Sequence, residues 1–451
     1  MTGTTNPDPI STRLRQIAEL ARSKPHLVFT GLNHHLDAEL LMEAYRRTRK
    51  SGAVGIDGET AEMYAKNLEA NLQALATRVH TGQYRAPPVR RVHIPKGDGS
   101  QTRPIGIPTF EDKVLQRAVA MLLEAVYEQD FLDCSFGFRP GRSPHDALDA
   151  LRAGAMQMGG GWVIDADIKA FFDTLDHKRL NELLDRRVRD GVLRRLIQKW
   201  LHAGVLDEGT VIHPEAGTPQ GGVISPLLAN IYLHEVLDTW FHTEVTPRLR
   251  GQAILIRYAD DFVVVCAEEA DARKVLEVLP KRFEKYNLVL HPDKTRLVPF
   301  RRPPFPWEEG PPPTGGGTGP GSYDLLGFTH YWGRTRKGGW AILWKTAKSR
   351  FTRALRSIAE WMKRNRHQPV PVQHKTLEQK LRGHYNYYGV TCNGRALQRF
   401  AFEVTRRWKK WLGRRSQRAY LSKDRFKVLM ARFPLPQPRL TRSIYRQAAN
   451  P

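Results

Sequence analysis

Asp260 and Asp261 are two adjacent carboxylates that stand between two apolar runs rich in β-branched residues. The runs on either side, 254–256 and 262–265, predict strands, and the polar pair between them predicts a tight hairpin turn. Aspartate is a frequent turn residue for reasons of backbone geometry alone. This pair by itself therefore fits an ordinary turn about as well as it fits an active site.

A second acidic segment lies far upstream, at 162–173, with the sequence WVIDADIKAFFD. We predict a strand here. Because Asp165 and Asp167 are two residues apart, their side chains would point to the same face of that strand. A strand with carboxylates on one face, together with a hairpin that carries two more, is a pattern that a turn alone does not explain.

Carboxylates gathered beside apolar strands repel one another, and loss of water increases the cost. A hard divalent cation removes that objection, and Mg²⁺ is usually held by one or two carboxylates plus substrate phosphates. Two such ions about 3.5–4 Å apart stabilise the attacking and the leaving oxygen of a phosphoryl displacement. We therefore predict a polymerase-type site in which Asp167, Asp260 and Asp261 bind two Mg²⁺ ions.

Several motifs resemble those of reverse transcriptases and follow one another in the order that the family uses. They are the Asp167 strand, TPQGGVISPLLANIYL at 218–233, YADD at 258–261 and LGF at 326–328. Over roughly 50–410 the chain is similar to bacterial group II intron reverse transcriptase/maturases. The resemblance implies an α/β (α+β) right-hand polymerase, with fingers, an antiparallel palm sheet and a helical basic thumb.

The chain divides accordingly into five expected segments. They are an N-terminal helical extension (1–55), fingers (56–160), a palm (161–344) with a Pro/Gly-rich insert (301–322), a thumb or maturase domain (345–400) and a basic C-terminal region (401–451). We also predict a hairpin at 90–108 and amphipathic helices at 110–127, 271–286 and 377–390.

The resemblance assigns nucleotide and template contacts to six residues: Lys96, Arg103, Phe172, Gln220, Gly221 and Lys294. In the fingers hairpin, Lys96 and Arg103 would hold the triphosphate, although without the resemblance they read equally well as solvated charges. Phe172 would be the steric gate that rejects a ribose 2′-hydroxyl, with a packed core phenylalanine as the alternative. Gln220 and Gly221 would line the nucleotide pocket, and Lys294 either contacts pyrophosphate or forms a surface ion pair.

The net charge of +25 is concentrated in the last quarter of the chain. Residues 345–451 hold 27 Lys and Arg against four acids, whereas the first 344 residues hold 44 against 42. Such asymmetry predicts a polyanionic partner, and phosphate backbone is the usual one. The expected nucleic-acid contacts are Arg139, Arg142, Arg353, Arg356, Arg382, Arg406, Arg407, Lys409, Lys410, Arg414 and Arg415.

Other classes of protein find no support in the composition. No run approaches 18 apolar residues and the start lacks an apolar signal region, so we expect a bacterial cytoplasmic protein with no membrane partner. Three distant cysteines suggest neither a disulfide framework nor a zinc site. The cysteines and histidines of an HNH endonuclease, which many relatives carry, are also missing, so DNA cleavage is not expected.

The sequence thus predicts an RNA-directed DNA polymerase of a group II intron, which also binds the intron RNA to assist splicing and retrohoming. Its partners would be intron RNA, an RNA template with a DNA primer, a DNA target and dNTPs. Two alternatives stay open: a splicing maturase with secondary polymerase activity, and a domesticated reverse transcriptase in a defence or CRISPR-linked setting. The oligomeric state is not predicted.

Overall fold

The computed structural model describes residues 9–96, 101–207, 210–212, 217, 221–303, 321–335, 338–416 and 420–443. The chain forms two compact units. Unit 1 comprises Met1–Leu151 and Trp162–Leu297, and unit 2 comprises Arg152–Gly161 and Val298–Pro451. This division does not follow the five expected segments one by one, so those segments stay a prediction.

A long, largely buried helix of unit 1 is α5 (Phe110–Tyr127), which has the bounds that the apolar periodicity predicts. Thr109 caps its first turn by accepting a hydrogen bond from the backbone of Asp112, and its apolar stripe is buried against α1 and α2. The other helices that lie wholly or partly in unit 1 are α1 (Pro9–Ser23), α2 (Ala38–Arg47), α3 (Ala61–Ala65), α4 (Leu68–His80), α6 (Pro144–Gln157), α7 (Phe171–Thr174), α8 (His177–Asp185), α9 (Gly191–Leu201), α10 (Ser225–Leu233) and α11 (Glu269–Glu284). Short 3₁₀ turns, η1 (Leu32–His35) and η4 (Thr246–Arg248), and two π-helical segments, η2 (His234–Thr239) and η3 (Phe241–Val245), complete them.

The predicted fingers hairpin is confirmed as β1 (Val89–Lys96) and β2 (Gln101–Ile107). The two strands are antiparallel, with Arg90 opposite Ile107 and Lys96 opposite Gln101. β4 (Val205–Asp207) and β5 (Thr210–Ile212) extend this sheet in the order β2-β1-β4-β5. The expected turn at 97–99 lies outside the described residues.

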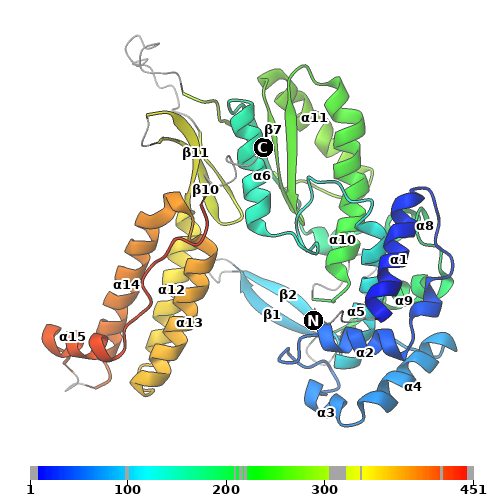
Figure 1. Ribbon diagram of the computed structural model, residues 1–451, viewed down its shortest axis with the longest axis horizontal. Helices are drawn as coiled ribbons and strands as arrows, with labels where there is room; N and C mark the ends of the chain where they lie inside the picture. The colour runs from blue at the N-terminus through cyan, green and yellow to red at the C-terminus, as the bar shows by residue number, and fades with distance from the viewer. Residues whose placement is uncertain are drawn as a thin grey trace, which may run out of the picture. The chain divides into compact units, whose positions relative to one another are not determined.

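A second sheet has the order β6-β7-β3-β8, from β3 (Trp162–Asp167), β6 (Ala253–Tyr258), β7 (Asp261–Cys266) and β8 (Arg296–Pro299). It is the antiparallel sheet expected of the palm. Alternate residues of β3 and β7 join one apolar cluster with residues of α10 and α11, and Figure 1 shows these two helices beside β7. The other face of the sheet is therefore the one that carries the aspartates.

The strand predicted over 162–173 is too long, because β3 ends at Asp167. Ile168 still forms a single bridge to Leu290, but Ala170 has a left-handed φ of 49°, which turns the chain into the short helix α7. The alternation of apolar and polar residues could not reveal this change of direction, because residues 168–173 are mostly apolar, as the residues of a buried strand are.

Unit 2 joins a three-stranded sheet, in the order β11-β10-β9, to a helical bundle. The strands are β9 (Tyr323–Leu325), β10 (Phe328–Arg334) and β11 (Trp340–Thr346). The helices are α12 (Lys348–Arg364), α13 (Val370–Tyr388), α14 (Gly394–Leu412) and α15 (Lys423–Arg432), with a 3₁₀ turn η6 (Thr391–Asn393). Figure 1 shows α12, α13 and α14 side by side, and their apolar faces share one core.

Two features of unit 2 differ from the sequence prediction. Helix α13 begins at Val370 rather than at 377, because Pro369 and Pro371 lie at its first turn, where proline is tolerated. The turn between β9 and β10, Leu326–Gly327, has positive φ at both residues. The Tyr387 hydroxyl of α13 donates to the Leu326 carbonyl at 2.7 Å, and a Cβ at Gly327 would lie 2.8 Å from the Tyr388 hydroxyl.

The burial of His330 predicts that unit 2 becomes less stable in mild acid. Its ring is fully buried, stacks on Tyr323 at 4.9 Å, and has no hydrogen-bond partner on either nitrogen among the described residues. Burial lowers the pKa of His330 to about 3. A folded pKa below the unfolded value gives stability that is complete above about pH 6.5 and is lost as the pH falls toward 3.

We therefore expect wild type to lose about 1.4 kcal/mol more than His330→Phe between pH 7.5 and pH 5.5. Urea unfolding of both proteins at the two pH values measures this difference. His384, which is half-buried and has its pKa lowered by burial to about 4, is present in both proteins, so its contribution cancels. Equal losses in the two proteins would contradict the prediction.

No helix among the described residues combines the length and the apolar character needed to cross a bilayer.

Candidate active site

The acidic hairpin forms as predicted, but its two-residue turn is Ala259–Asp260, and Asp261, which was expected in the turn, begins β7. Tyr258 lies opposite Asp261 across that turn, and Asp261 lies opposite Asp167 on β3. Because residues directly opposite one another on antiparallel strands share a face, the side chains of Tyr258, Asp261 and Asp167 lie on one face at one end of the sheet. Ala259 has a φ of 59°, a conformation that is rare outside glycine.

The electrostatics of Asp260 show that these carboxylates are close. Burial raises the pKa of Asp260, and the negative charge of Asp167 raises it further. The cations of Arg103 and Arg257 act in the opposite direction on the same pKa. The sheet thus concentrates negative charge at one end, which a bound cation would relieve.

Two cations of the chain itself already contact this acidic end. The Lys294 ammonium lies 2.5 Å from an Asp167 oxygen, and Arg296 forms an ion pair with Asp165 at 2.8 Å. Lys294 therefore lies at the site, as the resemblance implies. Asp165 faces the same way as Asp167 but is engaged by Arg296.

The donor set fits a divalent metal of the kind that arrives with its substrate. Among the described residues, no three or more acidic, histidine or cysteine side chains are gathered closely enough to hold a metal ion by themselves. Mg²⁺ is rarely bound by an all-protein cage, and usually takes one or two carboxylates plus phosphate oxygens and water. Asp167 and Asp261 at paired strand ends, with Asp260 in the adjacent turn, are hard oxygen donors of the kind that this mode of binding uses.

Arg103 is the predicted fingers cation that the structure places near the site. Its side chain is exposed on β2, and its charge acts on Asp260. The side chain of Lys96 and all of Gln220 lie outside the described residues, so their predicted roles stay predictions.

Gly221 contacts the fingers strand through its backbone. It has a φ of 118°, and a Cβ there would lie 2.5 Å from the Gly106 carbonyl oxygen and 2.7 Å from the Ile105 side chain. Two residues later, the Gln116 side chain of α5 accepts a hydrogen bond from the Val223 backbone at 2.8 Å. Gln116 was not predicted, because a glutamine on an apolar helix gives no sequence signal of this role.

Phe172 and Phe171 occupy different environments. Phe171 is buried in the core, whereas Phe172 is half-buried and its ring contacts Phe171 edge-on at 5.3 Å. The exposed part of Phe172 leaves it available to a substrate, five residues after Asp167.

Arg139 does not lie where a template contact needs it. It is 6% exposed, and its guanidinium binds Glu128 and the carbonyls of Leu132 and Ser135. These contacts stabilise the interior and leave no donor for a phosphate, which argues against its predicted role. Arg142 is more accessible but forms an ion pair with Asp133 at 2.6 Å.

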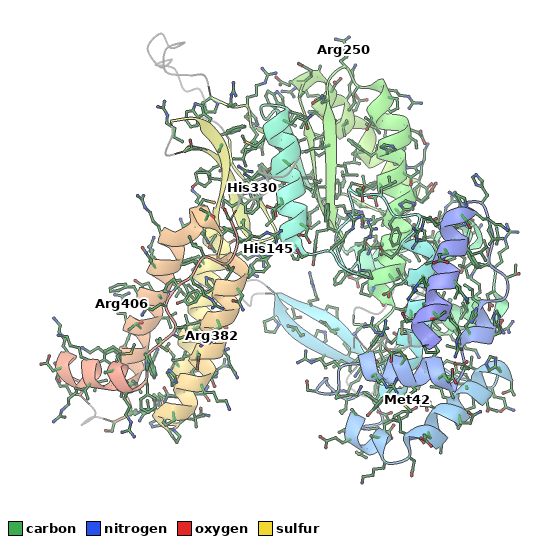
Figure 2. The ribbon with its side chains drawn as sticks, in the orientation of Figure 1. Met42, His145, Arg250, His330, Arg382 and Arg406 are labelled. Atoms are coloured by element: carbon green, nitrogen blue, oxygen red, sulfur yellow. The ribbon has the colours of Figure 1, made fainter. Side chains whose placement is uncertain are left out.

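The predicted cations of unit 2 lie on its helices α12, α13 and α14 and just beyond. Arg353, Arg356, Lys410 and Arg414 are exposed, and Lys410 and Arg414 lie near the Trp411 ring. Figure 2 shows Arg382 and Arg406 on their helices. The remaining predicted cations have partners: Arg382 pairs with Glu378, Arg406 and Arg407 pair with Glu403, Lys409 lies near the Phe426 ring, and Arg415 binds the Gln368 carbonyl.

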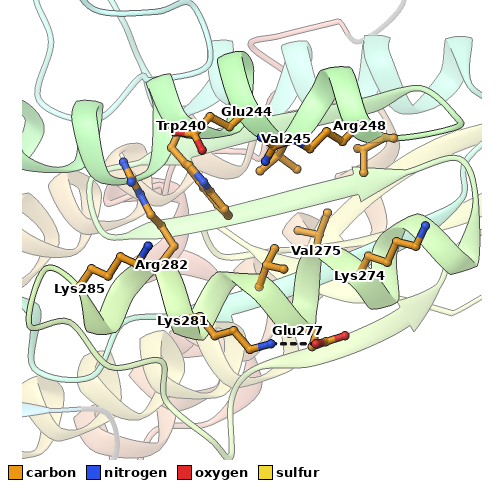
Figure 3. A pocket seen from close by; sticks show the side chains of 12 residues that line it. Trp240, Glu244, Val245, Arg248, Lys274, Val275, Glu277, Lys281, Arg282 and Lys285 are labelled. Atoms are coloured by element: carbon orange, nitrogen blue, oxygen red, sulfur yellow. Dashed lines mark hydrogen bonds and ion pairs between the residues drawn. The ribbon is translucent and has the colours of Figure 1, made fainter.

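A cavity of about 400 Å³ in unit 1 does not include the aspartates. It lies between the η3 region and α11, with Trp240, Val245 and Val275 among its apolar lining residues (Figure 3). Five cations also line it: Arg248, Lys274, Lys281, Arg282 and Lys285. None of its lining residues belongs to the predicted site.

The fold and the acidic hairpin define a nucleic-acid polymerase, and the chain belongs to the reverse transcriptase (RNA-dependent DNA polymerase) family, whose model matches residues 94–330. A second family model, the group II intron maturase-specific domain, matches residues 350–432. It spans the expected thumb and much of the basic C-terminal region.

Curated relatives agree with both assignments. The chain is 35% identical over 322 residues to protein YkfC of Escherichia coli (strain K12), an alignment that covers 64% of this chain and 84% of YkfC. It is 38% identical over 289 residues to the group II intron-encoded protein LtrA of Lactococcus lactis subsp. cremoris, covering 61% of this chain but only 47% of LtrA. A 91 kDa protein in the cob intron of Schizosaccharomyces pombe is 33% identical over 242 residues, covering 52% of this chain and 29% of that protein.

Proposed function

We propose that the chain copies RNA into DNA from dNTPs, with two Mg²⁺ ions held by Asp167, Asp260 and Asp261. The pairing of Asp167 with Asp261 across β3 and β7, beside the turn that carries Asp260, is the observation that supports this most directly. The three carboxylates would hold the ions, which would supply Lewis-acid assistance to the primer 3′-hydroxyl and to the departing pyrophosphate.

The other residues of the site would orient the substrates. Arg103, which is exposed on β2 and acts on Asp260, would hold the triphosphate, together with Lys96 from the other strand of the hairpin. Lys294 forms an ion pair with Asp167 and would offer its ammonium to the leaving group. Gly221, with Gln220 before it, would border the nucleotide where the backbone approaches β2.

We further propose that the basic helices of unit 2 bind the intron RNA and so assist splicing and retrohoming into a DNA target. The match to the maturase-specific domain and the exposed cations on α12 and α14 support this role. A maturase whose polymerase activity is secondary, or a reverse transcriptase in a defence setting, would use the same site. The genes that flank the coding sequence would distinguish a reverse transcriptase in a defence setting from the other two alternatives. The bacterial cytoplasmic location stays a prediction.

Primer extension on an RNA template tests the polymerase directly. We expect DNA synthesis from dNTPs that requires Mg²⁺ and stops when the metal is chelated. Absence of synthesis, or synthesis that continues in chelator, would overturn the proposal. For the splicing role, filter binding should show preference for the flanking intron RNA over an unrelated RNA of equal length, with affinity that falls steeply as salt rises.

Phe172→Ala tests the steric gate. Removing the ring should admit a 2′-hydroxyl and raise the use of rNTPs relative to dNTPs by about 10–100-fold, measured as the ratio of kcat/KM for the two substrates. Phe171→Leu is the matched control, since it changes the neighbouring buried ring and should leave this ratio unchanged. An unchanged ratio in Phe172→Ala would assign Phe172 to packing alone.

A further inference from the structure

Arg257, the residue before the YADD motif, is fully buried, and all five of its guanidinium N–H donors have acceptors. Nε and Nη2 bind the two carboxylate oxygens of Asp238 at 2.7 and 2.5 Å, and Nη2 also donates to the Ser135 hydroxyl at 2.7 Å. Nη1 donates to the Asn230 side-chain oxygen at 2.9 Å and to the Ala259 carbonyl at 3.0 Å. A charged group this deeply buried is held only by such complete pairing.

The acceptors come from four separate parts of unit 1. Asn230 belongs to α10, Asp238 to the π-helical segment η2, Ser135 to the loop after α5, and Ala259 to the catalytic turn. Asp238 is itself fully buried, so the pair is charge-balanced inside the core. π-helical segments are uncommon and frequently accompany functional sites.

Backbone contacts also hold the loop after α5, which carries Ser135, against β6 and the catalytic turn. The Arg257 amide donates to the Cys134 carbonyl at 2.8 Å, and the Phe136 amide donates back to the Arg257 carbonyl at 2.9 Å. A Cβ on Gly137 would lie 2.3 Å from the Ala259 nitrogen, and the Asn230 side chain donates to the Gly137 carbonyl at 2.7 Å. The turn therefore rests on a surface that Arg257 and Asn230 organise.

We infer that Arg257 is a positioning residue for polymerisation. It fixes the position of the catalytic turn and thereby the position of the Asp260 carboxylate. The Ala259 carbonyl that it binds belongs to the peptide joining Ala259 to Asp260, and Ala259 is held in a left-handed conformation. A contact to that peptide fixes the backbone from which Asp260 projects. The inference rests on the proposed polymerase function.

A purely structural role for the ion pair makes a different prediction, and Arg187 offers the matched control. It is also a buried arginine of unit 1, 7% exposed, and it pairs with Asp130 and binds the carbonyls of Ala21, Pro25 and Leu27. None of its partners belongs to the hairpin. Loss of either arginine should weaken the fold, but only loss of Arg257 should alter the catalytic turn.

The experiment compares Arg257→Lys and Arg257→Met with Arg187→Lys and Arg187→Met in the full chain, with activity normalised to the folded fraction. For the Arg257 variants we expect kcat for primer extension to fall about 10–100-fold, because small misplacement of a catalytic group has effects of this size. We also expect the Mg²⁺ concentration for half-maximal activity to rise several-fold, and KM for dNTP to change less than about threefold. The Arg187 variants should lose stability but keep kcat and the metal requirement.

Arg257 variants that lose stability alone, as the Arg187 variants do, would overturn the inference. If the Arg257 variants do not fold, Asn230→Ala decides instead: it removes one Nη1 acceptor and the support of Gly137, and should lower kcat and raise the Mg²⁺ requirement in folded protein. Unchanged values for both would also overturn it. Failure of the polymerase proposal is distinguishable, because wild type would then show no extension.

Discussion

Asp261→Asn is expected to lower kcat for primer extension by about 10²–10³-fold, the size of effect seen when one group that stabilises transition-state charge is removed. Asp261 on β7 lies opposite Asp167 on β3 and opposite Tyr258 on β6. The substitution keeps the shape of the side chain and removes its charge, so the loss would report on metal binding. The measurement is steady-state extension over a range of Mg²⁺ concentrations.

The thermal stability of the Asp261→Asn protein should not fall with its activity. The variant removes one of several neighbouring negative charges, so its thermal midpoint should equal or exceed that of wild type. Asp165→Asn is the matched control, because Asp165 shares the face of Asp167 but is engaged by Arg296. We expect its kcat to stay within about threefold of wild type. Equal losses in the two variants would show that general charge, and not the pairing of Asp167 with Asp261, supports activity.

Replacing four exposed cations of unit 2, Arg353, Arg356, Lys410 and Arg414, by alanine should weaken binding of intron RNA by about 10²–10³-fold at moderate salt. The slope of log affinity against log salt is negative, and each lost phosphate contact reduces its magnitude by about 0.7–0.9. The slope of this variant should therefore be shallower by about 3. A salt series of filter-binding measurements gives both values.

Four of the five cations that line the unit 1 cavity, Arg248, Lys274, Lys281 and Lys285, provide a control of equal charge. Replacing them by alanine changes the net charge of the chain by the same amount. If the helices of unit 2 form the RNA interface, this second variant should keep nearly the wild-type slope. Equal decreases in both variants would mean that net charge alone governs affinity.

Local patterns predicted the elements that carry the site, because those elements are regular. Helix α5 has its predicted bounds, and the acidic hairpin and the fingers hairpin form as alternation and turn residues indicated. The spacing of Asp165 and Asp167 placed both on one face, but only the register of β3 on β7 shows that Asp167, and not Asp165, lies opposite Asp261. Register between distant strands is a tertiary property that a single sequence does not display.

Buried polar groups were the main failure of prediction. Arg139 was expected at the surface, yet Glu128 and nearby carbonyls satisfy it inside the protein. Arg257, Asp238 and Asn230 were not predicted at all, because their partners lie on four elements that the sequence does not bring together. A signal was present: an arginine directly after three strand residues, Ile254–Ile256, is costly unless it is paired. Helix α15 was also missed, since its composition resembles that of its basic flanks.

The turn at Leu326–Gly327 is tied to helix α13. It belongs to LGF at 326–328, one of the motifs that resemble those of reverse transcriptases, and Tyr387 and Tyr388 of α13 contact it. Because the Tyr387 hydroxyl binds the Leu326 carbonyl and the Tyr388 hydroxyl leaves no room for a side chain at Gly327, we expect the helix and the turn to move together.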